Sequence, residues 1–90
     1  MNSVDLKRKF IYDYLEKNKI CSMLDQKFVD EYIEKFNPKS VRYTNYGANK
    51  CKELSLILST MYRDGDLTRN VVGLRELGMG FPKWIYVYEL

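Results

Sequence analysis

The 90-residue chain contains no histidine, only two cysteines and two prolines, and no long run of apolar residues. Without histidine, no imidazole is present to act as an acid–base catalyst or a metal ligand. Two thiolates are too few for a four-cysteine zinc site. No apolar run approaches the roughly 18 residues of a membrane span, and residues 1–6 lack the apolar block of a signal peptide. The sequence therefore predicts a cytoplasmic protein without a metal, a cofactor, a membrane contact or an evident small-molecule substrate.

The composition is typical of a small globular domain. Hydrophobic residues make up 46% of the chain and charged residues 30%, which is too apolar for a disordered tail. A chain of this length suits one domain with a small core, because it buries only about two-thirds of its unfolded surface. We expect residues 1–90 to form that single domain.

The net charge of +3 is concentrated in one segment. Residues 1–35 and residues 56–90 each carry as many acidic as basic side chains. Residues 36–55 carry four basic side chains against Glu53 alone, which accounts for the whole excess. A local basic excess is the electrostatic footprint that a polyanion selects, although four lysines and arginines also occur on many ordinary solvated surfaces.

Apolar spacing predicts two helices in the first half of the chain. The first runs over about residues 4–17, with Ser3 as its N-cap. The second is capped by Asp25 or Ser22 and presents one apolar stripe that ends at Phe36. Asparagine followed by proline ends this helix, because the residue before proline is disfavoured in helical geometry.

A third helix is predicted over about residues 48–63, or from Thr44 onward. Asp64 and Gly65 are expected to end this helix, since glycine readily adopts the left-handed cap conformation. Residues 39–47 are the least periodic part of the chain, and they are expected to form a connection with at most one helical turn.

The remaining segments predict strands. Residues 20–21 suit a brief strand, and residues 67–72 alternate with a period of two. Residues 83–90 are rich in aromatic and β-branched side chains and give the clearest strand of the chain. Between the last two strands, residues 74–82 contain two glycines and a proline and are expected to form a flexible loop.

This order of helix, short strand, two helices, strand, long loop and strand resembles the winged helix-turn-helix superfamily. The residues that carry the resemblance are the helix end and following strand at 54–69, LSLILSTMYRDGDLTR, and the closing strand at 84–90, WIYVYEL. The resemblance implies an α+β fold with three helices and a C-terminal two-stranded β-hairpin wing, as in small stand-alone regulators of archaea, viruses and phages. The link over residues 36–48 is longer than the usual turn, which leaves the start of the third helix open.

The resemblance also implies a DNA interface. The third helix would enter the major groove, and the wing at 74–83 would contact the backbone or minor groove. Lysines at this interface would contact phosphates, Asn45 and Asn49 would hydrogen-bond adenine, and Arg42 would hydrogen-bond guanine. The ten candidate residues are Lys39, Ser40, Arg42, Thr44, Asn45, Asn49, Lys50, Lys52, Arg75 and Lys83. The alternatives are that the asparagines cap the third helix, that the lysines are solvated, and that Arg75 pairs with Glu76.

Aromatic residues suggest a homodimer. Trp84, Tyr86 and Tyr88 share one face of the last strand, and Tyr12 lies off the main stripe of the first helix. We expect these four residues to form a dimer interface, which in winged helices places two recognition helices on successive major grooves. The alternative is a monomer with tyrosines at its surface.

Three further residues have structural interpretations. Arg69 is expected to pair with Asp64 or Asp66. Two buried free thiols are favoured over a disulfide between the two cysteines, because the cytosol is reducing, and the disulfide stays open.

The sequence offers little for catalysis. The closest pair of carboxylates, Asp64 and Asp66, flanks a glycine turn. Residues 78–80 lack the length of a phosphate-binding loop and the helix that follows one. We therefore expect a sequence-specific double-stranded DNA-binding protein, a transcriptional regulator rather than an enzyme. The alternative is a winged-helix adaptor or inhibitor that binds a host or polymerase protein and no DNA.

Overall fold

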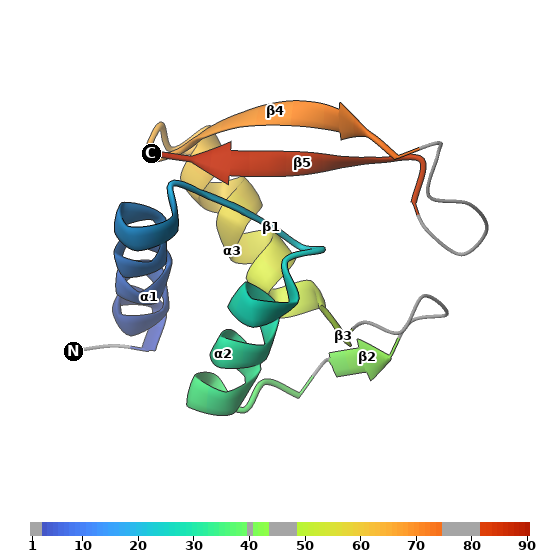
Figure 1. The fold of residues 1–90 in the computed structure, drawn as a ribbon. Coiled ribbons are helices and arrows are strands. Elements are labelled where there is room, and N and C mark those ends of the chain that lie inside the picture. The colour runs from blue at the N-terminus through green and yellow to red at the C-terminus, as the bar shows by residue number, and fades with distance from the viewer. Residues whose placement is uncertain (1–2, 40, 44–48, 75–81) are drawn as a thin grey trace.

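The computed structural model describes residues 3–39, 41–43, 49–74 and 82–90, which form three helices and five strands (Figure 1). The elements in chain order are α1 (Ser3–Asn18), β1 (Ile20–Ser22), α2 (Gln26–Phe36), β2 (Val41–Tyr43), β3 (Asn49–Cys51), α3 (Lys52–Arg63), β4 (Thr68–Gly73) and β5 (Trp84–Glu89). The predicted α+β architecture, with three helices and a C-terminal antiparallel hairpin, is confirmed and is compatible with a winged helix.

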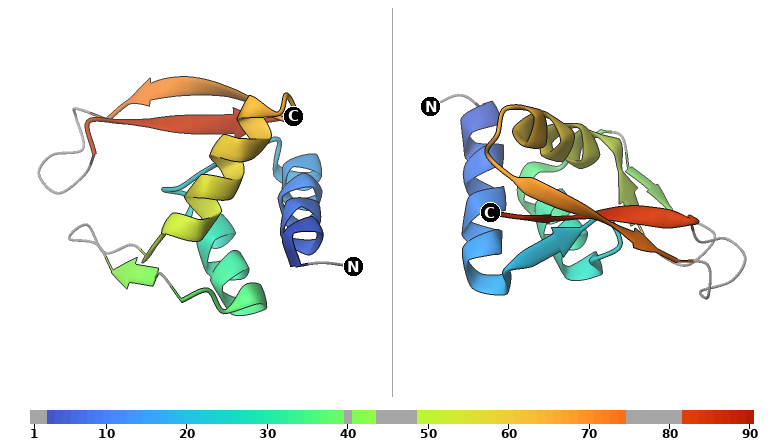
Figure 2. Two further views of the ribbon diagram at one scale, coloured as in Figure 1. Left: turned by 180° about the vertical axis from the view of Figure 1, so that it is seen from behind. Right: turned by 90° about the horizontal axis from the view of Figure 1, so that it is seen from above.

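The main sheet has the strand order β1-β5-β4, and all pairs are antiparallel. The short strand β1 therefore joins the C-terminal hairpin by pairing with β5, although about 60 residues separate β1 from β5 in sequence. Figures 1 and 2 show this sheet lying across one end of the three helices. Cys21 and Arg69 flank Tyr88 in the register, so these three residues share the sheet face that is turned toward the helices.

The hydrophobic core lies between this sheet face and the helices. Its fully buried larger side chains come from all three helices: Ile11, Leu15, Phe28, Val29, Tyr32, Leu54, Leu58 and Met61. Burial of one such side chain contributes roughly 1.5–3 kcal/mol relative to exposure. The half-buried Phe10 packs against this core, with its ring 5.8 Å from that of Phe28 and 5.7 Å from that of Tyr32.

Helix α2 begins and ends at the predicted residues. Asp25 is the N-cap, since its carboxylate accepts a hydrogen bond from the Phe28 N–H at 3.3 Å. The same carboxylate accepts a 2.6 Å bond from the Tyr14 hydroxyl, which ties α1 to the cap. Asn37 takes left-handed geometry, with φ 46°, and the next residue is Pro38. Asparagine tolerates this conformation better than most residues, so the chain leaves the helix here.

The predicted start of α3 is wrong. The helix begins at Lys52, and the residues expected to form its first turn instead form β3, which pairs with β2. The N-cap is Cys51, whose side chain makes no capping bond, so Asn49 does not cap the helix. The pairing supplies the physical reason: each short strand satisfies backbone groups of the other, which a longer helix would have satisfied internally.

The predicted end of α3 is confirmed. Gly65 has φ 85°, its N–H bonds to the Tyr62 carbonyl, and the Asp66 N–H bonds to the Met61 carbonyl. These two bonds make a Schellman motif, in which the left-handed residue satisfies carbonyls that the helix leaves free.

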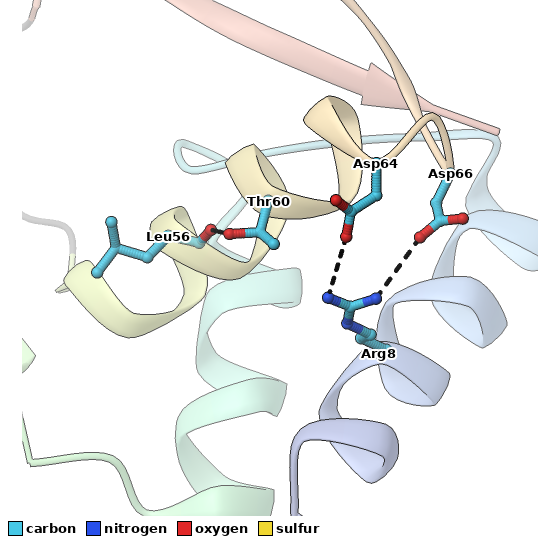
Figure 3. Close-up of polar contacts among 5 residues, drawn as sticks. All are labelled: Arg8, Leu56, Thr60, Asp64 and Asp66. Atoms are coloured by element: carbon cyan, nitrogen blue, oxygen red, sulfur yellow. Dashed lines mark hydrogen bonds and ion pairs between the residues drawn. The ribbon is translucent and has the colours of Figure 1, made fainter.

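Ion pairs connect α1 to both ends of α3. At the C-terminal end, the Arg8 guanidinium lies 3.3 Å from Asp64 and 3.7 Å from Asp66 (Figure 3). At the N-terminal end, Glu53 accepts a hydrogen bond from the Tyr32 hydroxyl and lies 3.1 Å from the Lys7 ammonium. The first helix therefore contacts α3 through ion pairs at both of its ends.

Both cysteines are free and buried, as the sequence favoured. Burial raises the pKa of the Cys21 thiol to about 12, with a smaller contribution from the nearby Asp25 carboxylate. Across the described ranges, no helix is long and apolar enough to cross a membrane.

Candidate nucleic-acid interface

The solvent-facing side of α3 forms one stripe of four residues, Lys52, Leu56, Ser59 and Arg63, hereafter the outer stripe. Their spacing of four, three and four residues places them on one face of an α-helix. The opposite face is buried through Leu54, Leu58 and Met61. Of the outer stripe, only Lys52 is among the site residues predicted from the sequence. The same apolar periodicity that identified the buried face also defines its opposite, so the other three were within reach of the sequence.

The basic segment over residues 36–55 contains the β2–β3 hairpin, which directly precedes α3 in the chain. Arg42 in β2 lies directly opposite Lys50 in β3, and both side chains are exposed. Directly opposed residues of an antiparallel pair have Cβ atoms about 5 Å apart, and like charges in this position are destabilising. The neighbouring position Cys51 is fully buried, so alternation puts Arg42 and Lys50 on the hairpin face turned away from the core.

No acidic side chain neutralises this basic group within the described part of the chain, where none of the ion pairs involves Arg42, Lys50 or Lys52. The nearest acid in sequence, Glu53, is held by Tyr32 and Lys7 instead. The hydrogen bond from the Tyr32 hydroxyl, together with Lys7, lowers the pKa of Glu53 despite its partial burial. Glu53 is therefore fully ionised at neutral pH, and its charge is engaged on the α1 side of the helix.

Two hairpins extend from the same side of the molecule. Figure 1 and the rear view in Figure 2 both show the β2–β3 hairpin and the far ends of β4 and β5 reaching in one direction, with the N-terminal end of α3 toward that side. Lys83, just before β5, is exposed on the second hairpin. The structure thus places the β2–β3 cations, Lys52 and the far end of the C-terminal hairpin toward the same side of the molecule.

Several sequence-predicted residues take other positions. Arg42, Asn49 and Lys50 lie on the β2–β3 hairpin, so their assignment to the third helix or an unstructured approach to it is corrected. Lys39 is exposed after α2, and Lys52 is the first residue of α3. Ser40, Thr44, Asn45 and Arg75 lie outside the described residues.

Arg69 does not pair with Asp64 or Asp66, contrary to the expectation from sequence. Those two carboxylates face Arg8. The Arg69 guanidinium instead lies between two aromatic rings, 3.8 Å from the Tyr62 ring centre and 3.9 Å from that of Tyr86. A planar cation suits such stacking, and this contact fixes the C-terminal hairpin to the end of α3.

The predicted dimer residues have separate environments. Tyr88 is only 3% exposed and belongs to the core, so its place in an interface is corrected. Tyr86 is half-buried against Arg69, whereas Trp84 is 50% exposed. Tyr12 is half-buried, and its burial and the nearby Asp66 carboxylate raise its pKa.

An open groove of about 460 Å³ runs between α1 and α3. It is lined by Val4 and Arg8 from one helix and by Leu56 and Thr60, among others, from the other. The Thr60 hydroxyl donates a 2.9 Å hydrogen bond to the Leu56 carbonyl within the helix, so its proton is already engaged (Figure 3). The described residues contain no cluster of three or more metal-ligating side chains.

Comparison with known proteins finds no match: no family model, no curated protein and no solved structure is significantly similar to this chain. The architecture is therefore described by its own elements, a small α+β domain of three helices and a C-terminal antiparallel hairpin, compatible with a winged helix.

Proposed function

We propose that this chain is a winged-helix protein that binds double-stranded DNA, with the outer stripe of α3 in the major groove, and that it acts as a transcriptional regulator. The observation that carries the proposal is the unneutralised basic group formed by Arg42 opposite Lys50 and by Lys52 at the start of α3. Opposed like charges cost stability in the free protein. A polyanion removes that repulsion on binding, which makes it the partner that fits this surface.

The dimensions of α3 also support the proposal. Twelve residues give a helix about 18 Å long at 1.5 Å per residue, and the major groove of B-DNA admits one helix. Lys52 and Arg63 stand at opposite ends of the outer stripe, where the phosphates flanking a groove are within reach of long side chains. Leu56 and Ser59 lie between them and face the base edges in this arrangement. The segment 74–83 then acts as the wing, with Lys83 at its edge.

The test measures binding to random-sequence duplex DNA at low salt, with fluorescence anisotropy as the readout. The variant Lys50→Glu/Lys52→Glu removes two positive charges and adds two negative ones at the proposed site. Its matched control, Lys17→Glu/Lys27→Glu, makes the same charge change at exposed positions of α1 and α2. We expect the first variant to lose binding and the control to retain it, with circular dichroism confirming that both are folded.

Absence of duplex binding by the wild-type chain at low salt would refute the proposal. The second candidate, a module that binds another protein, is favoured by one observation. The sheet face turned away from the helices carries Ile20, Val72, Ile85 and Val87, and the first two are exposed apolar side chains. A chain that binds no duplex but captures a purified protein partner through this face would support that alternative.

A further inference from the structure

The centre of the outer stripe is apolar. Leu56 is 55% exposed, the largest exposure among the described leucines. Its neighbours on the stripe are Lys52 four residues before it, Ser59 three residues after it and Arg63 seven residues after it. Leu56 borders the groove between α1 and α3, which Val4 and Arg8 also line, and Figure 3 shows its side chain pointing away from the Arg8 guanidinium. A leucine in this position adds little to the core, since more than half of it faces water.

Its surroundings favour a nucleic-acid partner for this side chain over a purely apolar one. The flanking positions on the same face are a lysine and an arginine, and Arg42 and Lys50 lie on the adjoining hairpin. On the groove side, Leu56 adjoins the apolar Val4 and Ile57 and the carboxylate of Glu53, which is already paired with Lys7. A partner that lies along the outer stripe and covers Leu56 therefore meets positive charge on both sides of an apolar group. The major groove is complementary to this pattern, because phosphates line it and each thymine presents a methyl group on its floor.

We infer that Leu56 is a specificity-determining residue that contacts the 5-methyl group of thymine, so that the protein prefers thymine to other bases at the position beneath it. This inference rests on the proposed DNA binding. Lys52 and Arg63 position the helix through phosphates, which carry no sequence information. Ser59 is compatible with any base, since a hydroxyl both donates and accepts. Among the four residues of the outer stripe, Leu56 is the one whose contact distinguishes a methyl group from its absence.

Deoxyuridine provides a direct probe, because uracil pairs like thymine but lacks the 5-methyl group. Two pools of random duplexes of about 20 base pairs are prepared, one with thymidine and one with deoxyuridine. Affinities of both pools are measured for the wild-type chain, Leu56→Ala and Leu56→Met. The matched control is Leu6→Ala, which truncates another exposed leucine on α1. Circular dichroism verifies that each variant is folded.

We expect the wild-type chain to bind thymine duplexes about fourfold more tightly for each methyl group contacted, the equivalent of one buried methylene. Leu56→Ala should bind both pools equally, whereas Leu56→Met and Leu6→Ala should keep the preference. A double-mutant cycle of this kind isolates the contact between side chain and methyl group.

The other outcomes are distinct. Equal binding of both pools by the wild-type chain overturns the inference and leaves the proposed function intact. A thymine preference that persists in Leu56→Ala also overturns it, because the methyl group then acts through DNA shape or another residue. Binding of neither pool overturns the proposed function, and this inference with it.

Discussion

The salt dependence of DNA binding should reveal how many cations of the proposed site contact phosphates. Four exposed basic residues lie there: Arg42, Lys50, Lys52 and Arg63. Each phosphate contact contributes about −0.9 to the slope of log affinity against log salt, so four contacts give about −3.6. Affinity should then fall about 150-fold between 50 and 200 mM salt. The variant Arg42→Gln/Lys50→Gln should have a slope about 1.8 smaller in magnitude and lose only about 12-fold over the same range.

The assay is fluorescence anisotropy of one labelled duplex across a salt series. The difference between the two slopes is the useful quantity, because contacts made elsewhere on the protein contribute equally to both. The control Lys17→Gln/Lys27→Gln changes net charge by the same amount at sites away from the hairpin, and its slope should equal that of the wild type. If the control changed the slope as much as the hairpin variant, long-range attraction rather than local contact would explain binding, and the assigned face would be refuted.

Three further predictions concern stability and reactivity. Gly65→Ala should cost about 1 kcal/mol in urea unfolding, because φ is 85° and alanine is strained there, whereas Gly73→Ala, at a position with equally open space and no positive φ, should cost nothing measurable. Tyr32→Phe should cost about 1.5 kcal/mol at pH 7 by removing a hydrogen bond to ionised Glu53. The pKa of Glu53 lies below its ordinary value of 4.5, so its contribution to stability is present above pH 4.5 and is lost as the pH falls through the lowered pKa. Tyr32→Phe should therefore lose less free energy of unfolding on acidification than the wild type. An unchanged dependence of unfolding free energy on pH would contradict this. Cys21 should resist a thiol reagent at pH 8 in the native state, since its pKa is raised to about 12, and should react fully in urea; rapid labelling of the folded chain would count against its burial.

The sequence predicted the helices and the main strands because each has a local signal. Asp25 and Asn37 have side chains suited to the two ends of α2, and both act there. Gly65 ends α3 for a comparable local reason. These interactions span only a few residues, so a pattern of residue types is enough to place them.

The β2–β3 hairpin escaped prediction because nothing local requires it. Cys51 is buried at the end of β3 and also continues the apolar spacing of Leu54 and Leu58, so a helix extended backward from Lys52 would bury it equally well. Strands of three residues carry little periodicity, and pairing between segments apart in sequence decides the structure. Without the hairpin, Arg42 and Lys50 are assigned to separate segments, although the structure makes them directly opposed neighbours.

The ion-pair partners of charged residues could not be predicted from the sequence either. Asp64 and Asp66 are the acids nearest to Arg69 in the chain, yet they pair with Arg8, 56 residues before Asp64. This pairing depends on how α1 packs against the end of α3, which no spacing rule supplies. Arg69 is then left to stack between two tyrosine rings.

The two faces of β5 show why alternation alone does not identify an interface. Trp84, Tyr86 and Tyr88 do share one face, as predicted, but Ile85 and Val87 make the other face apolar as well. Because either face could cover a core, the pairing with neighbouring strands determines which face is turned inward. Strand β1 places the buried Cys21 beside Tyr88, so the aromatic face is turned toward the helices. The aromatic face is therefore covered at Tyr88 and becomes exposed toward Trp84, where the hairpin extends beyond α3 (Figure 1). An interface that uses Trp84 would therefore lie at the far end of the hairpin, where the aromatic face is exposed, and would leave out the buried Tyr88.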